Sequence, residues 1–179
     1  MVAIKRILDT GAHGVLVPWI NTKEDAEYAV QACKYPPEGL RGFGPRRAAL
    51  VDRNYVATAN EEVLVIAQIE TREAVDNLDD ILSVEGIDAV YIGPMDLSRS
   101  YGLTFPDIKD PDFLAAHDKV LTTAKKWKKP AGIYAFSNNI EWVIEKGFTL
   151  ITLDSADIFL MRGAITALKK AKATMGQER

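Results

Sequence analysis

The sequence is poor in the features on which several classes of protein depend. Its single cysteine, Cys33, cannot form an internal disulfide, which favours a reducing, cytoplasmic compartment. No apolar run approaches the roughly 20 residues that span a bilayer, and the first nine residues hold no apolar stretch of signal-peptide length. The 22 Lys and Arg nearly balance the 25 Asp and Glu, for a formal net charge of -3. We therefore expect neither a membrane nor a nucleic-acid partner.

Catalytic constellations built on histidine or cysteine are also absent from the sequence pattern. His13 precedes the first expected strand, at the end of the sheet away from any chemistry, so we expect a structural role. His117 falls in the middle of an expected helix and is interpreted as a surface residue. Cys33 stands late in a helix, where a small packing residue is more common than a nucleophile. No Ser–His–Asp or Cys–His arrangement is expected.

What remains is an ordinary globular composition, with 47% hydrophobic and 26% charged residues, which excludes a disordered or fibrous chain. The length of 179 residues suits one domain over residues 1–179. It falls short of the about 250 residues that a complete (β/α)₈ barrel requires.

Short apolar runs alternate with longer amphipathic segments along the chain, the pattern of an α/β protein with a parallel sheet. The apolar runs are continuous, as in strands that are buried on both faces. We expect five strands, at residues 14–17, 63–69, 89–92, 131–135 and 149–153. Helices are expected at residues 2–9, 22–34, 71–82, 111–128, 139–146 and 157–173.

A long excursion over residues 34–60 separates the first full helix from the second strand. Its density of Pro and Gly over residues 35–45 indicates a shaped loop, and loops of this length are usually functional. Arg41, Arg46 and Arg47 form a basic cluster here, which we interpret as a solvated loop or a subunit contact.

Two acidic residues follow neighbouring strands at the edge where barrels carry their active sites. Glu70 comes directly after the strand over 63–69, and Asp96 comes shortly after the strand over 89–92. Adjacent strands lie about 4.8 Å apart, so the two side chains can converge. Carboxylates that close repel unless a proton or a cation separates them, and oxygen ligands suit Mg²⁺ or Mn²⁺. The alternative is that both residues cap helices in βα loops.

Two further features point to ligand binding at this edge. Gln68 lies on the same face as Glu70 by the two-residue period of a strand, either to contact a ligand oxygen or as a satisfied core amide. Residues 93–98 offer backbone N–H groups before a short turn or helix, and such groups bind anions such as a carboxylate.

These motifs make the chain similar to a known family, the HpcH/HpaI family of class II, metal-dependent pyruvate aldolases, typified by 4-hydroxy-2-oxoheptanedioate aldolase. The matching segments cover essentially the whole chain in order. They include LDTGAHGVLVP at residues 8–18, YPPEGLRG at 35–42, QIETREA at 68–74 and GIDAVYIGPMDLS at 86–98.

The resemblance implies a fold, a cofactor and a set of site residues. The fold is a partial (β/α)₈ TIM barrel of about five parallel strands with flanking helices. Glu70 and Asp96 would hold a divalent metal, Mg²⁺ or Mn²⁺, with Co²⁺ as a further candidate. Gln68 and the backbone amides of Met95 and Asp96 would contact pyruvate or a similar 2-oxo acid. The reaction would cleave or form a C–C bond through a metal-stabilised enolate, as in other lyases of this kind.

The resemblance also has a gap, because the family's first three strands have no counterpart and Met1 already falls in the helix after the third. Those strands supply a catalytic His with an acidic partner and a substrate-binding Arg. His13 does not match that His, so no catalytic residue is assigned. We expect an impaired aldolase or, alternatively, a non-catalytic metal- or oxo-acid-binding or assembly module. The third hypothesis is a metal-independent α/β binding protein.

Open sheet edges and apolar helix faces need a partner. We therefore expect a homo-oligomer, with the C-terminal helix as a candidate for exchange between subunits.

Overall fold

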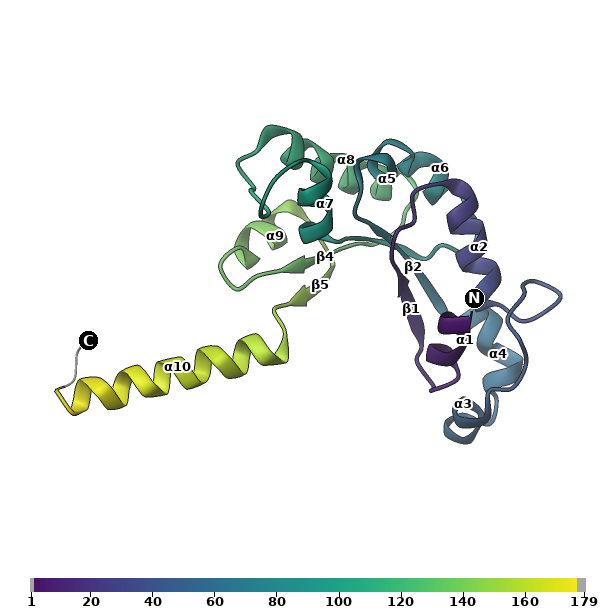
Figure 1. Cartoon of the computed structure of the whole chain (residues 1–179). Helices are drawn as coiled ribbons and strands as arrows, with labels where there is room; N and C mark the ends of the chain where they lie inside the picture. The colour runs from purple at the N-terminus through teal and green to yellow at the C-terminus, as the bar shows by residue number, and fades with distance from the viewer. Residues whose placement is uncertain (1, 177–179) are drawn as a thin grey trace.

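The computed structural model describes residues 2–176; Met1, which the resemblance places in the first helix, lies outside this range with residues 177–179. Within the described range, five strands form one parallel sheet in the order β1-β2-β3-β4-β5. The sheet curves into a half-barrel (Figure 1), and the expected fold class is confirmed. The strands are β1 (Gly14–Val17), β2 (Leu64–Ile69), β3 (Ala89–Ile92), β4 (Ala131–Ala135) and β5 (Leu150–Leu153).

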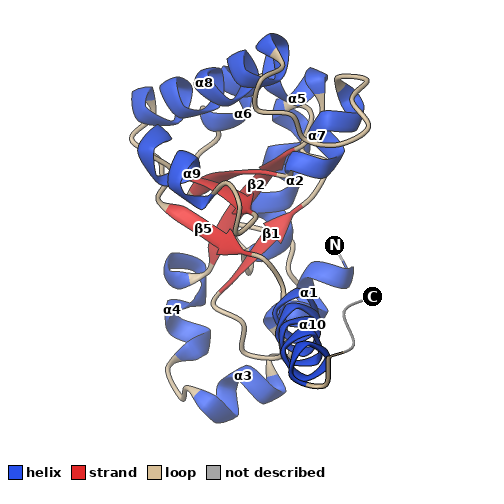
Figure 2. Cartoon of the chain, turned by 90° about the vertical axis from the view of Figure 1, so that its left-hand side faces the viewer, coloured by secondary structure: helices blue, strands red, loops and turns tan. Residues whose placement is uncertain are grey.

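The helices alternate with the strands, and several of them cover the outer face of the half-barrel. Helices α2, α8 and α9 contact the strands directly, and Figure 2 shows α5, α6 and α8 together on one side of the sheet. The helices are α1 (Val2–Leu8), α2 (Lys23–Cys33), α3 (Arg46–Val51), α4 (Tyr55–Glu62), α5 (Arg72–Asp76), α6 (Leu78–Leu82), α7 (Pro94–Ser100), α8 (Pro111–Lys126), α9 (Ile140–Lys146) and α10 (Ala156–Thr174).

Local signals in the sequence set several of these helix ends. Thr22 caps α2 with a capping box, in which its hydroxyl accepts from the Asp25 N–H and the Asp25 carboxylate accepts from the Thr22 N–H. Asp110 caps α8, whose first residue is Pro111. Gly147 ends α9 in the left-handed conformation, with φ 97°. The expected positions of these helices are confirmed to within a few residues.

The two-residue period of the strands separates an outer face from an inner face. On β2, Val65, Ala67 and Ile69 point outward into the helix layer and are at most 1% exposed. Leu64 on the inner face is 48% exposed. Cys33 is buried among apolar side chains of the helix layer, and burial raises the pKa of its thiol to about 11, which confirms it as a packing residue.

Two expectations about helices were wrong. The single helix expected over 71–82 is two short helices, α5 and α6, which meet at Asn77. The Asn77 side chain donates to the backbone carbonyl of Asn21, which ties the junction of the two helices to the segment before α2. The excursion over 34–60 is a loop only in its first part, because α3 and α4 occupy much of the rest. Ala48 and Ala59 bury one face of each of these helices.

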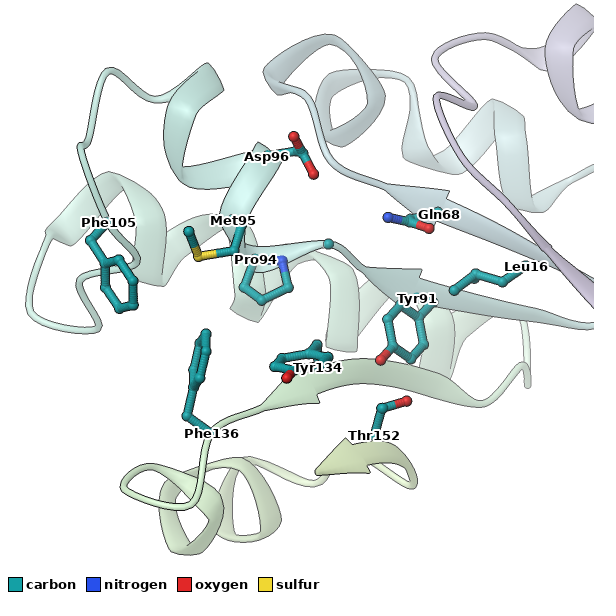
Figure 3. Close-up of a pocket in the computed structure, with 11 residues that line it drawn as sticks. Leu16, Gln68, Tyr91, Pro94, Met95, Asp96, Phe105, Tyr134, Phe136 and Thr152 are labelled. Carbon is teal, nitrogen blue, oxygen red and sulfur yellow. The ribbon is translucent and has the colours of Figure 1, made fainter. Parts of the chain in front are cut away.

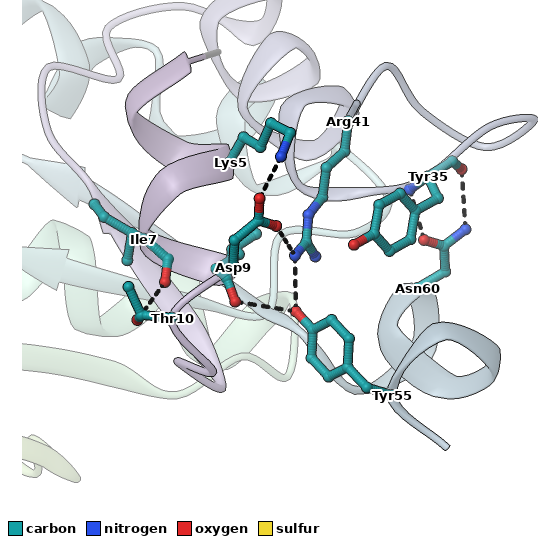
Figure 4. Close-up of polar contacts among 9 residues, drawn as sticks. Lys5, Ile7, Asp9, Thr10, Tyr35, Arg41, Tyr55 and Asn60 are labelled. Carbon is teal, nitrogen blue, oxygen red and sulfur yellow. Dashed lines mark hydrogen bonds and ion pairs between the residues drawn. The ribbon is translucent and has the colours of Figure 1, made fainter. Parts of the chain in front are cut away.

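Arg41 is not a solvated loop residue. Its side chain is fully buried, and one guanidinium nitrogen donates to Asp9 at 3.0 Å and to the Tyr55 hydroxyl at 2.9 Å (Figure 4). The guanidinium also lies over the Tyr35 ring, 4.4 Å from its centroid. The loop over 35–45 is therefore anchored near α1 and to α4 through the buried Arg41 guanidinium. Interpreting the basic cluster as a solvated loop or a subunit contact misses this role.

His117 is likewise buried, at 1% exposure, and not a surface residue. Its ring packs edge-on against Phe113, with centroids 4.5 Å apart, and against Trp142 at 5.6 Å. Its Nδ1 lies 2.7 Å from the Phe113 carbonyl. Burial in this aromatic cluster lowers the pKa of the imidazole below its ordinary value.

Helix α10 projects away from the half-barrel (Figure 1). It is described in full, and none of its residues is buried. Near its first turns, Arg162 donates to Asp154 and Ser137, which links it to the ends of β4 and β5. Leu160 is 75% exposed and Met161 59%. Within residues 2–176, no helix is both long and apolar enough to cross a membrane.

Candidate functional site

Glu70 lies at the carboxyl end of β2 and is held there by two neighbours. It is only 2% exposed. Its Oε1 accepts from the Trp19 backbone N–H at 2.9 Å, and its Oε2 accepts from the Gln68 amide. Burial raises the pKa of this carboxyl and the Asp96 charge raises it further, against the two hydrogen bonds, which lower it. The expectation that Gln68 and Glu70 share a face is confirmed by their hydrogen bond.

Trp19 is the positioning residue that sequence reasoning missed. It follows β1, the neighbour of β2, and has φ 57°, a left-handed conformation that is uncommon outside glycine. In this conformation the Trp19 backbone N–H points at Glu70, and the Trp19 side chain is 63% exposed. Because the backbone N–H makes the contact, the tryptophan side chain gives no indication of this role. Only the position of Trp19 just after a strand could have suggested it.

Gly93 allows β3 to approach the Gln68–Glu70 pair. A Cβ at this position would lie 2.7 Å from both Gln68 Nε2 and Glu70 Oε2. The close approach brings the next residues, in α7, to the same edge of the sheet. Asp96 is exposed in the first turn of α7, near enough for its charge to act on Glu70.

The backbone amides of Met95 and Asp96 belong to the same first turn. The Leu97 N–H donates to the Gly93 carbonyl at 2.9 Å and closes the first turn of the helix. The amides of Met95 and Asp96 precede it, where helical N–H groups have no partner within the helix. The structure thus places all four sequence-predicted site residues at one edge.

These residues fit a divalent cation that completes its shell with other oxygens. The two carboxylates of Glu70 and Asp96 are oxygen donors of the kind that Mg²⁺ and Mn²⁺ prefer, and Mg²⁺ usually keeps several waters. Burial is the main cause of the raised pKa of Glu70, and the Asp96 charge adds to it; a cation between the two carboxylates would offset that repulsion. Among residues 2–176 there is no group of three or more His, Cys, Asp or Glu side chains that could hold a metal ion.

A cleft of about 530 Å³ opens beside this edge on the inner face of the sheet. Figure 3 shows Gln68 and Leu16 toward one end and Phe105, Phe136 and Met95 gathered at the other, with Asp96 above. The lining residues are Leu16, Gln68, Tyr91, Gly93, Pro94, Met95, Asp96, Phe105, Tyr134, Phe136 and Thr152. The sequence analysis missed the aromatic residues of this cleft. The two-residue period of the strands could have placed Tyr91 and Tyr134 on the inner face of the sheet.

Both histidines, each within the described range, lie away from this edge. His13 is exposed in the turn before β1, at the opposite end of the strands. His117 is enclosed by Phe113, Trp142 and Phe148 in the helix layer. Neither imidazole can serve as an acid or base for a ligand in the cleft.

The comparisons with known proteins assign the chain to a family. Residues 1–156 match the family model for HpcH/HpaI aldolase/citrate lyase. The chain belongs to this family, and the resemblance drawn from its motifs is confirmed.

Two characterised relatives come from bacteria. A hydroxypyruvate/pyruvate aldolase of Rhizorhabdus wittichii is 38% identical over 173 residues, which cover 95% of this chain and 69% of the relative. A 5-keto-4-deoxy-D-glucarate aldolase of Escherichia coli is 36% identical over 171 residues, covering 93% of this chain and 66% of the relative. The chain thus spans about two thirds of the length of these relatives.

A solved structure shows the same arrangement of elements. The crystal structure of a HpcH/HpaI aldolase/citrate lyase family protein from Burkholderia cenocepacia superposes with a TM-score of 0.85 at 36% sequence identity. The match covers 94% of this chain and 68% of that structure's chain.

Proposed function

We propose that the chain is an aldolase-type lyase for 2-oxo acids such as pyruvate, with Glu70 and Asp96 as the ligands of Mg²⁺ or Mn²⁺. The observation that carries the proposal is the buried Glu70 carboxylate, fixed by Trp19 and Gln68 beside a second carboxylate at the carboxyl edge of the sheet. Membership of an aldolase family and relatives that act on hydroxypyruvate or pyruvate support the substrate class.

Each residue of the edge has a distinct task in this proposal. The cation, when bound, offsets negative charge that develops on the keto oxygen of the substrate as the C–C bond breaks or forms. Glu70 and Asp96 hold it, and Trp19 keeps Glu70 in place. Gln68 uses one amide hydrogen for Glu70, which leaves the other to donate to a substrate oxygen. The amides of Met95 and Asp96 orient the substrate carboxylate.

The described residues supply no imidazole base at this edge, and a positioned base contributes about 10²–10⁴-fold. We therefore propose that retro-aldol cleavage by the 179-residue chain alone is weak or undetectable. Slow decarboxylation of oxaloacetate would survive, because that reaction abstracts no proton from a hydroxyl.

A second candidate function is a non-catalytic oxo-acid-binding or assembly module of the same family. The exposed helix α10 favours assembly, because its apolar residues Phe159, Leu160 and Ile165 are each at least 50% exposed. In either case we propose a homo-oligomer in which α10 packs on a neighbouring subunit.

Isothermal titration with Mn²⁺, alone and with oxalate or pyruvate, tests the cation site. We expect Mn²⁺-dependent oxalate binding by the unmodified chain and its loss in Glu70→Gln and in Asp96→Asn, with circular dichroism unchanged. Asp80→Asn, at an exposed position in α6, is the matched control and should bind normally. Unfolding of either site variant would instead assign Glu70 or Asp96 a structural capping role.

Release of pyruvate, followed with lactate dehydrogenase, then separates the two candidate functions. An aldolase-type lyase that lacks its base should decarboxylate oxaloacetate slowly but faster than free Mn²⁺ does, whereas a non-catalytic module should release no pyruvate beyond the rate with Mn²⁺ alone. Retro-aldol turnover near the median enzyme rate of about 10 s⁻¹ would contradict the proposed weakness.

A further inference from the structure

The far end of the cleft is built from aromatic side chains that the proposed cation site does not use. Phe105 and Phe136 face each other with ring centroids 5.7 Å apart, and Tyr134 lies 5.2 Å from Phe136. Met95 lies beside them (Figure 3). Three rings and a thioether at these spacings form an apolar surface that accepts a flat group by offset or edge-on contact.

The floor of the cleft is also aromatic. Tyr91 is paired across the sheet with Gly132, and a Cβ there would lie 2.5 Å from Tyr91 Cδ2. The absent side chain at Gly132 thus lets the Tyr91 ring lie across β4. The Tyr91 hydroxyl lies toward Thr152 on β5 (Figure 3). The floor of the cleft is therefore an aromatic ring that lies across the neighbouring strand.

The charges around the cleft restrict what can occupy its aromatic end. Of the described residues that line it, Asp96 is the only charged one, and it belongs to the proposed cation site. A ligand with a second carboxylate would bring that group among Phe105, Phe136 and Met95 without a cationic partner, which is costly. A flat apolar group meets no such penalty there.

We propose, on the basis of the function proposed above, that the cleft selects 2-oxo acids whose remote part is aromatic rather than carboxylate-bearing. The carboxylate and keto group would lie at the Gln68–Asp96 end, and the ring would pack against the surface that Phe105 and Phe136 form together. Phe105 and Phe136 are then specificity-determining residues for the substrate half beyond the keto group.

Two ligands that share a 2-oxobutanoate unit test this assignment. 2-Oxo-4-phenylbutanoate and 2-oxoglutarate carry a phenyl group and a carboxylate, respectively, at the same carbon, and neither has the 4-hydroxyl that cleavage needs. In calorimetry with Mn²⁺, we expect the phenyl compound to bind at least about tenfold more tightly than 2-oxobutanoate, as burial of one ring in an apolar cleft provides. 2-Oxoglutarate should bind no better than 2-oxobutanoate.

Variants locate the effect within the cleft. Phe105→Ala, at a side chain that is 57% exposed, and Phe136→Ala should each remove most of the phenyl preference and leave oxalate binding unchanged. Phe43→Ala, at a 73% exposed ring in the loop over 35–45, is the control and should change neither. Saturation-transfer NMR on the phenyl protons should show the same pattern.

Equal or tighter binding of 2-oxoglutarate would overturn the inference, as would a phenyl preference that survives both alanine variants. In either case oxalate binding would still support the cation site. Loss of oxalate binding by the unmodified chain would instead overturn the proposed function, and this inference with it.

Discussion

The two faces of the sheet are made by alternate residues of the same strands, yet they differ sharply. On the outer face, Val65 and Ile92 are at most 1% exposed beneath the helix layer. On the inner face, Leu16 and Leu64 are 41% and 48% exposed. The outer face therefore supplies the stability of the half-barrel, whereas the inner face and its carboxyl edge are free to contact a ligand or another part of an assembly.

The largest expected effect follows from the outer face. Ile92→Ala removes a fully buried side chain from the layer between β3 and the helices. Substitutions of this kind cost about 2–5 kcal/mol, from lost burial and the cavity left behind. Urea unfolding followed by circular dichroism should show a large fall in the free energy of unfolding.

Leu64→Ala on the inner face is the matched control for Ile92→Ala. Because this side chain is already half exposed, we expect a loss below about 1 kcal/mol. Equal losses for both variants would mean that the inner face also carries the core, and the contrast between the faces would be wrong.

The same contrast explains what the sequence could predict. Continuous apolar runs located all five strands, and Gln68 and Glu70 could be placed on one face, because the extended backbone turns alternate side chains to the same face whatever the residue type. Arg41 and His117 were misplaced because their burial depends on partners such as Asp9 and Trp142, which only the folded chain brings near. Prediction from the sequence pattern is thus least reliable for polar residues that are buried in the helix layer.

The candidate site likewise contains residues that the sequence could predict and residues that it could not. Its carboxylates follow strand ends and could be found from spacing. Trp19 could not, because it acts through a backbone N–H. The aromatic end of the cleft depends on Phe105, in the loop between α7 and α8, meeting Phe136 after β4, a long-range pairing without a local signal.

A smaller effect is expected from His117, the titratable group buried in the outer layer. Its folded-state pKa is lowered by burial, with opposing effects from the Phe113 carbonyl and the Asp118 charge and a reinforcing one from Lys146. The unfolded chain therefore binds the proton more readily. Stability should be full above the unfolded pKa of about 6.5 and fall as the pH drops below it, by at most about 1.4 kcal/mol per pH unit.

Urea unfolding between pH 7.5 and 5 measures this slope, and His117→Phe is the comparison. The variant should lose the part of the slope that comes from imidazole, since phenylalanine binds no proton. An unchanged slope in His117→Phe would assign the acid sensitivity to carboxylates elsewhere in the chain.

Helix α10 should show the smallest effect on the stability of the subunit and a clear effect on its assembly. Leu160→Asp with Ile165→Asp changes two side chains that are 75% and 50% exposed, so at low protein concentration the free energy of unfolding should change by less than about 0.5 kcal/mol. If α10 packs on a neighbouring subunit, these charges enter an apolar interface and the oligomer dissociates. Light scattering at micromolar concentration should then give at least a dimer for the unmodified chain and a monomer for the variant. Lys169→Asp, at another exposed position of the same helix, controls for added negative charge. An unmodified chain that is monomeric would show that the exposed apolar side chains of α10 do not drive self-association.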